Sequence, residues 1–238
     1  MHSNRYTFIY AAVISIITAV LLAFASEGLK PAQEANIALD NKSNILRSVR
    51  VEETERAAIE QIYGERVKSI VVNSKGDVLE NVIAEDLVMK NEVTKPAAER
   101  HLPLYVYTDK NGKPYYIVPV RGVGLWGPIW GYISIESDFN TVYGAFFDHK
   151  SETPGLGAEI AEKPFQEQFR GKKIMTDDNR FISVNVVKKA AKVSFGDEHR
   201  VDAISGGTIT STGTDKMLKN CLEPYLGYFE KLQSQESK

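Results

Sequence analysis

One long apolar run near the N-terminus dominates the hydropathy pattern of this chain. Residues 8–25 read FIYAAVISIITAVLLAFA and contain no charged side chain, and hydroxyls are their only polar side-chain groups. A helix rises about 1.5 Å per residue, so about 20 residues span a hydrocarbon core of about 30 Å. With Tyr6 and Thr7 the run is just long enough, and it predicts one transmembrane helix.

A cleaved signal peptide is the alternative for this run, because Ala23-Phe24-Ala25 fits an A-x-A cleavage site. The run is nevertheless longer than the roughly 7–15 apolar residues of a signal peptide, which favours a retained anchor. Its flanks offer only Arg5 against Lys30 for the positive-inside comparison. A single N-terminal span with a basic flank usually leaves its short end inside, so we expect the large remainder outside the cytoplasmic face.

Helical spacing follows the apolar run. Pro31 suits a first helical position, and Ala35 and Leu39 begin a series of apolar residues near helical spacing. We predict helix over residues 31–63, ending near Gly64. A connector from the membrane to the main domain and a charged helix packed on that domain fit this segment equally well.

Beta-rich runs separated by turn residues come next. Residues 67–72 and 78–83 predict a first hairpin, and residues 104–108 and 115–120 predict a second around Asn111-Gly112. The remaining elements are strands over 129–136, 141–148 and 181–187, a short amphipathic helix over 164–170, and a helix over 211–232 broken near Pro224. Strands in runs with few helices between them predict an α+β fold, a mainly antiparallel sheet with flanking helices.

Composition then excludes several classes of protein. The 238 residues carry 29 Lys+Arg and 31 Asp+Glu, so a net charge of −2 offers no bulk attraction for nucleic acid. The lone cysteine, Cys221, cannot form an internal disulfide, a CxxC zinc site or a cysteine-held cluster. It lies among apolar neighbours of the last helix, which predicts a buried structural thiol. The four histidines are far apart in sequence, so no metal site is predicted.

Residues 122–127, GVGLWG, match the dinucleotide pattern G-x-G-x-x-G. That fingerprint must open a helix, so that the pyrophosphate meets the helix N-terminus. Here Pro128 and another strand follow, and we therefore predict a hairpin turn.

The most informative stretch is residues 202–213, DAISGGTITSTG. Two adjacent glycines permit close backbone approach, five hydroxyl residues surround them, and a helix follows. The free N–H groups and positive end of that helix suit an anion such as phosphate. A Ser/Thr-rich N-cap without any ligand fits the same pattern.

Residues 202–208, DAISGGT, resemble the flavinylation motif D-x-x-[ST]-G-A-[ST], whose last residue carries FMN through a phosphoester. By position that residue is Thr208, and Gly207 stands where the motif usually has Ala. E-T-P-G-L-G at 152–157, G-L-W-G at 124–127 and A-L-D-x-x-x-x-I-L at 38–46 extend the resemblance over nearly the whole chain.

These motifs resemble the C subunit of the sodium-translocating NADH:quinone reductase. The G subunit of the Rnf electron-transport complex shares the flavin motif and E-T-P-G-L-G, whereas the A-L-D segment favours the former. The resemblance implies an FMN that a separate flavin transferase attaches to Thr208 from FAD. It assigns ten residues to the cofactor site: Thr208, Ser205, Gly206, Gly207, Asp202, Thr153, Gly155, Leu156, Gly157 and Trp126.

Within that site, Ser205, Gly206 and Gly207 would offer backbone donors to the phosphate, and the 153–157 segment would form the opposite wall. Trp126 would either pack at the flavin ring or fill the core. Asp202 would tie down the turn, assist phosphate transfer or simply be solvated.

The resemblance further implies a relay of single electrons, from an iron–sulfur centre of partner subunits to a second flavin subunit. No catalytic residue beyond the flavin and no independent turnover are expected. An Rnf-type flavoprotein subunit and an anchored binding or assembly module without flavin are the alternatives.

The expected organisation is an anchor over 1–30, a helical connector with the first hairpin over 31–95, and a covalent FMN-binding domain over 96–238. Residues 8–25 would contact lipid of a bacterial inner membrane in a single pass, with the main domain on the periplasmic side.

Overall fold

The computed structural model describes residues 4–191 and 193–236, which form one compact unit up to Asn41 and a second from Lys42 onward. Helix α1 (Asn4–Ser48) begins in the first unit and ends in the second. An 18-residue window of this helix has a mean hydropathy of 2.5 and no buried residue, so α1 is long and apolar enough to cross a membrane. The predicted apolar N-terminal helix is confirmed.

The predicted boundaries of the following helix are wrong. Pro31 lies inside α1 rather than at the start of a new helix. A proline within a helix can kink it without ending it. The helix stops instead at a Schellman turn, in which Arg50 has φ 64° and the Val51 N–H donates to the Leu46 carbonyl at 3.0 Å. A second helix, α2 (Arg56–Arg66), then continues through Gly64.

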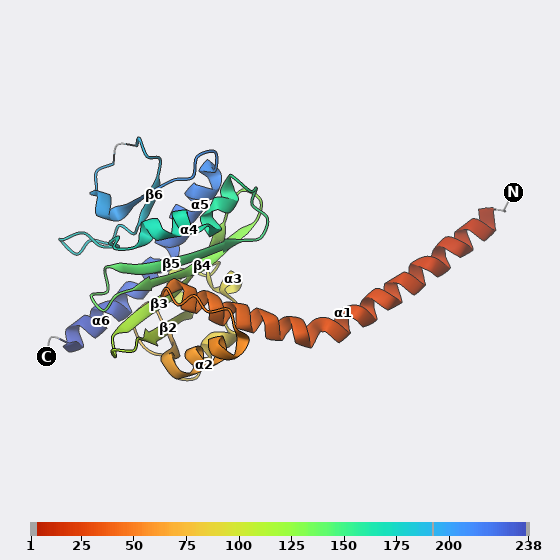
Figure 1. Ribbon diagram of the computed structural model, residues 1–238, viewed down its shortest axis with the longest axis horizontal. Helices are drawn as coiled ribbons and strands as arrows, with labels where there is room; N and C mark the ends of the chain where they lie inside the picture. The colour runs from red at the N-terminus through yellow and green to blue at the C-terminus, as the bar shows by residue number, and fades with distance from the viewer. Residues whose placement is uncertain (1–3, 192, 237–238) are drawn as a thin grey trace. The chain divides into compact units, whose positions relative to one another are not determined.

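A five-stranded antiparallel sheet forms the centre of the second unit (Figure 1). Its strands lie in the order of the chain: β1 (Val67–Val72), β2 (Leu102–Thr108), β3 (Pro114–Val123), β4 (Pro128–Ile135) and β5 (Val142–His149). Each strand pairs with the next, which confirms the predicted antiparallel sheet and the hairpin at Asn111-Gly112. Because β1 pairs with β2, the expected boundary between residues 95 and 96 separates two strands of one sheet.

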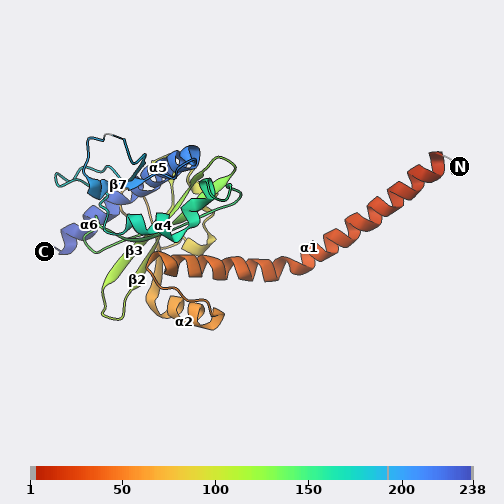
Figure 2. The ribbon, with the colours of Figure 1, turned by 45° about the horizontal axis from the view of Figure 1, so that its top comes forward.

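Alternating side chains give the sheet two apolar faces. On one face, Ile133 and Phe147 pack in a core with Met217 of α5 (Thr208–Leu222) and Phe229 of α6 (Leu226–Glu236). On the other face, Ser134 Oγ donates to the Ser48 carbonyl at 2.6 Å. Figure 2, like Figure 1, shows α5 and α2 on opposite sides of the sheet. The break between α5 and α6 is the 3₁₀ turn η6 (Glu223–Tyr225), which contains Pro224 as predicted.

Two predicted strands are mostly wrong. Residues 78–83 contribute only an isolated bridge between Val72 and Val78. Of residues 181–187, only β6 (Asn185–Val187) is a strand, because Ser183 has φ 64° and turns the chain. β6 pairs in parallel with β7 (Arg200–Asp202), a pairing that the sequence did not suggest.

Short helical turns complete the unit. The predicted amphipathic helix is α4 (Lys163–Gln166) followed by η4 (Glu167–Phe169), with Phe165 and Phe169 buried. Cys221 is buried in α5, as predicted. The others are η1 (Ala84–Asp86), α3 (Met89–Glu92), η2 (Ala97–Glu99), η3 (Gly157–Ala161) and η5 (Asp197–His199).

Candidate functional site

Three segments that are distant in the sequence, residues 124–127, 152–157 and 202–213, meet at the N-terminal end of α5. A Cβ added at Gly206 would lie 2.6 Å from Leu156 Cδ2, and one added at Gly124 would lie 2.6 Å from Glu152 Oε1. A Cβ at Gly213 would collide with the Val123 carbonyl oxygen. The motif glycines therefore permit close contact, and the structure brings the three predicted segments together.

Glu152 lies at the centre of this junction, and its residue is only 5% exposed. Its Oε1 accepts the Trp126 N–H at 2.8 Å, and its Oε2 accepts the Thr210 hydroxyl at 2.6 Å. Burial alone would raise the pKa of this carboxyl, but hydrogen bonds from Thr210 and the loop backbone outweigh burial and hold the pKa below its ordinary value. The hydrogen bonds around Glu152 therefore favour the ionised form of this buried carboxyl.

Glu152 and Thr210 were not among the ten predicted site residues. A signal for Glu152 was nevertheless present in the sequence, since it is a charged residue at the head of the uncharged run TPGLGA. A charge in such a run indicates either exposure or a specific set of hydrogen-bond donors.

Thr208 is the first residue of α5 and is exposed. Of the five hydroxyl residues in this stretch, three are hydrogen-bonded inside the protein: Thr210, Ser211 and Thr212. Within the part of the chain that the structure describes, the exposed hydroxyls of Ser205 and Thr208 have no hydrogen-bond partner. No side chain caps the helix at Gly207, so its first N–H groups remain available to an anion.

The two adjacent glycines before Thr208 differ in conformation. Gly206 has φ 76°, a left-handed backbone that favours glycine. Gly207 has φ −101° and is buried, and a Cβ there would lie 3.0 Å from Ile204 Cγ2 and 3.4 Å from the Gly157 nitrogen. The alanine that the motif usually has here would thus need only a small shift of Ile204.

The 153–157 segment forms a tight exposed turn next to this glycine pair. The Thr153 carbonyl accepts the N–H groups of Leu156 and Ala158, each at 3.1 Å. Gly155 has φ 76°, and a Cβ at Gly157 would collide with Glu152 Oε2 and Thr210 Oγ1. Leu156 is 42% exposed beside Gly206, as expected for a residue that lines an open site.

Trp126 combines a fixed backbone with an exposed side chain. The backbone N–H of Trp126 donates to Glu152, and its backbone carbonyl accepts the Ser151 hydroxyl at 3.0 Å. Trp126 as a whole is 65% exposed. The core-filling alternative for Trp126 is therefore wrong. We define the apolar collar as the exposed apolar residues on the three segments and at the end of β3: Val123, Leu125, Trp126, Leu156 and Ile209.

The G-x-G-x-x-G match is a hairpin turn, as predicted. The Gly124 N–H donates to the Gly127 carbonyl at 2.8 Å between β3 and β4. A dinucleotide fingerprint would instead lead into a helix.

Asp202 ends β7, and its hydrogen bonds do not involve the Thr208 hydroxyl. Its N–H donates to Gln168 Oε1 at 2.7 Å, and its carboxylate accepts from Arg200 at 3.4 Å. Among the described residues, Asp202 has no hydrogen bond to Thr208. Through its backbone N–H, Asp202 fixes the end of β7 to Gln168.

No group of three or more His, Cys, Asp or Glu side chains in residues 4–191 and 193–236 is arranged to hold a metal ion.

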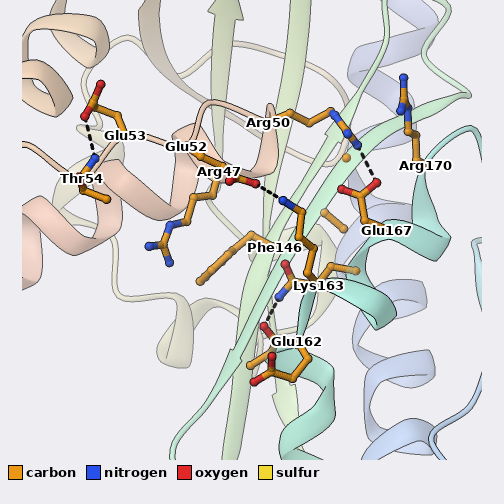
Figure 3. A pocket seen from close by; sticks show the side chains of 14 residues that line it. Arg47, Arg50, Glu52, Glu53, Thr54, Phe146, Glu162, Lys163, Glu167 and Arg170 are labelled. Atoms are coloured by element: carbon orange, nitrogen blue, oxygen red, sulfur yellow. Dashed lines mark hydrogen bonds and ion pairs between the residues drawn. The ribbon is translucent and has the colours of Figure 1, made fainter.

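A separate cavity of about 440 Å³ lies beside β5 (Figure 3). Arg50 pairs with Glu167 at 3.0 Å and Lys163 with Glu52 at 2.7 Å, so charges of opposite sign neutralise one another there. None of the ten predicted site residues is among the 14 that line this cavity. It is therefore distinct from the three-segment junction.

Comparison with known proteins agrees with this assembly. Residues 124–223, which include all three segments, match the family model "FMN-binding domain". The C subunit of the Na(+)-translocating NADH-quinone reductase of Haemophilus ducreyi is 30% identical, over 94% of this chain and 93% of its own length.

Two solved structures are also similar. The crystal structure of the same subunit from Parabacteroides distasonis is 42% identical, with a TM-score of 0.75 over 84% of this chain and 96% of that chain. Shewanella oneidensis NqrC is 26% identical, with a TM-score of 0.69 over 82% and 97%. The chain therefore belongs to the NqrC family, the C subunits of the Na(+)-translocating NADH-quinone reductase.

Proposed function

We propose that this chain is the electron-relay subunit of a membrane Na+-translocating NADH:quinone reductase and that it carries FMN on Thr208. The observation that carries the proposal is the exposed, unbonded hydroxyl of Thr208 at the uncapped start of α5, within a flavinylation motif. The FMN-binding domain match and the names of the relatives support the cofactor and the complex. When bound, FMN supplies the one-electron chemistry, and the protein supplies position and electrostatics.

The residues around Thr208 fit a phosphoester. The first N–H groups of α5 and the positive end of the helix favour a phosphate at this point. Ser205 and Gly206 add backbone N–H groups, whereas the Gly207 N–H already donates to the Ile204 carbonyl at 3.1 Å. The left-handed Gly206 lets the chain turn close to the phosphate.

Attachment would exchange the phosphoanhydride bond of FAD for a phosphoester bond to Thr208. Thr208 Oγ1 bonds to the phosphorus on the riboflavin side of FAD, and the bond from that phosphorus to the bridging oxygen breaks. AMP leaves with the bridging oxygen, and the hydroxyl proton passes to a base of the flavin transferase. No electron is transferred in this step, so the flavin keeps its oxidation state.

The walls of the site are the apolar collar and the 153–157 turn. Trp126 and Leu156 would supply apolar contacts to the ring, and the exposed Thr153 and Gly155 would supply backbone that can approach it. Gly157 is instead buried against Glu152 and Thr210. The backbone N–H of Asp202 ties the end of β7, where the motif begins, to the Gln168 side chain.

The relay needs partners on both sides. We propose iron–sulfur and flavin subunits of the same complex as electron donor and acceptor. Residues 8–25 would anchor the chain in the inner membrane by a single pass, with the domain on the periplasmic side. Copurified subunits with sodium-dependent quinone reduction would support this assignment, and copurified ferredoxin:NAD activity would contradict it.

The attachment test uses the full chain co-expressed with a flavin transferase. Fluorescence of the denatured band in a gel reports covalent flavin. We expect Thr208→Ala to abolish the fluorescence and Thr212→Ala, at an exposed threonine of the same helix outside the 202–208 motif, to retain it. A fluorescent Thr208→Ala band would mean that another residue is the acceptor, and a wild-type band without fluorescence would contradict the proposal.

A further inference from the structure

We propose that Glu152 is a positioning residue of the flavin site. Its buried carboxylate joins the 124–127 loop to the first turn of α5, and its negative charge lowers the reduction potential of a flavin carried by Thr208. This inference rests on the attachment proposed above.

The geometry of Glu152 connects the two sides of the site. One carboxylate oxygen holds the backbone of Trp126, and the other holds Thr210, two residues after Thr208 on the same helix. Gly124 and Gly157 border the carboxylate, and a Cβ at either position would press against it. Glu152 therefore helps to set the orientation of Trp126 relative to Thr208, together with the Ser151 hydroxyl that donates to the Trp126 carbonyl.

Within the part of the chain that the structure describes, the charge of Glu152 has no Lys or Arg partner, and the favourable charge interaction it does have is with His149. Among the described residues, no Lys or Arg forms an ion pair with it. Its own N–H donates to His149 Nδ1 at 3.2 Å, so this ring nitrogen acts as an acceptor. Hydrogen-bond donors stabilise the carboxylate but leave its net negative charge in place.

A buried negative charge disfavours a second negative charge nearby, and in a poorly solvated site this repulsion is weakly screened. Adding electrons to a flavin beside Glu152 is therefore less favourable than it would be beside a neutral amide. The positive end of α5 acts in the opposite sense, and Glu152 offsets it.

Glu92 offers a matched control within the same chain. It is also 5% exposed, but its carboxylate pairs with Lys95 at 2.7 Å and lies outside the three segments. Replacement of Glu92 by glutamine removes an equally buried carboxylate charge away from the site.

The potential is tested on full-length protein labelled by the transferase and kept in detergent. Redox titration of the covalently bound flavin should give a more positive midpoint for Glu152→Gln than for wild type, and no shift for Glu92→Gln. Glu152→Asp keeps the charge and should keep the wild-type midpoint. An unchanged midpoint in labelled Glu152→Gln, or an equal shift in Glu92→Gln, would overturn the electrostatic role.

The positioning role is tested without flavin, in a Thr208→Ala background. Glu152→Ala should accelerate hydrogen exchange at the Trp126 amide several-fold, whereas Glu92→Ala should not. Unchanged exchange would overturn the positioning role. Because this measurement needs no flavin, its failure is distinguishable from a failure of attachment at Thr208, which the wild-type fluorescence reports.

Discussion

The Thr210 hydroxyl donates to Glu152 Oε2 at 2.6 Å and joins two residues that are 58 positions apart in the sequence. Both residues are buried, at 1% and 5% exposure. The contact fixes the first turn of α5 to the loop after β5, so the stability of the domain and the shape of the site share one hydrogen bond.

We expect Thr210→Val to destabilise the protein by about 1–3 kcal/mol, because it leaves a buried carboxylate oxygen unpaired. The matched control is Thr212→Val, whose exposed hydroxyl bonds only to the Thr208 carbonyl and should change stability by less than about 0.5 kcal/mol. Urea unfolding of the full chain in detergent measures both. Equal losses would contradict a special role for the Thr210 hydroxyl.

Acid should remove the contribution of Glu152 to stability. The folded state holds the pKa of this carboxyl below its ordinary value of 4.5, so folding favours the ionised form. The stabilisation is fully present above the ordinary pKa and is lost as the pH falls through the folded one. The difference in unfolding free energy between wild type and Glu152→Gln should therefore be constant near neutral pH and shrink below about pH 4.5. A difference that grew in acid would contradict this sign.

The two adjacent glycines should respond oppositely to alanine. At Gly206 the left-handed backbone and the contact with Leu156 should cost about 1–2 kcal/mol or more and reduce flavin attachment. At Gly207 the φ of −101° is outside the left-handed region and alanine needs only a small shift of Ile204, so it should change stability by about 1 kcal/mol and keep the protein fluorescent. Thermal unfolding and in-gel fluorescence measure both variants. Loss of label in Gly207→Ala alone would contradict this assignment.

Tyr225→Phe should lower stability by about 1–2 kcal/mol, because the buried Tyr225 hydroxyl donates to the Pro103 carbonyl at 2.7 Å. The matched control is Tyr228→Phe, at a half-buried tyrosine whose hydroxyl has no hydrogen-bond partner among the described residues. Urea unfolding should show a loss only for the former. Equal stability of the two variants would contradict the role of this bond in holding η6 against β2.

Local signals predicted much of the fold. The Asn111-Gly112 turn between two β-rich runs was enough to identify the β2–β3 hairpin, because its chemistry is local. Elements that depend on backbone geometry were not predictable in this way. The left-handed Ser183 shortened one expected strand to β6, and the Schellman turn at Arg50 lies far from the expected helix end.

The candidate site, like the fold, was predictable from the sequence only in part. Adjacency of the three motifs was implied by the family resemblance and is present in the structure. The links that hold them were not visible in the sequence, since Glu152 and Thr210 lie in different motifs and neither reveals its partner. The exposure of Trp126 also depends on tertiary structure, and only the fold excluded it from the core.

The order of the strands has a consequence for when the Thr208 surface comes into existence. Strands β2 to β5 follow one another through short turns, so this part of the sheet forms through short chain closures, whereas the 73–101 segment separates β1 from β2. The surface around Thr208 instead requires segments near residues 124, 152 and 206 to meet, which happens only once α5 has docked. Any enzyme that recognises this surface therefore distinguishes finished chains from nascent ones, and a modification placed there marks a chain that has completed its folding.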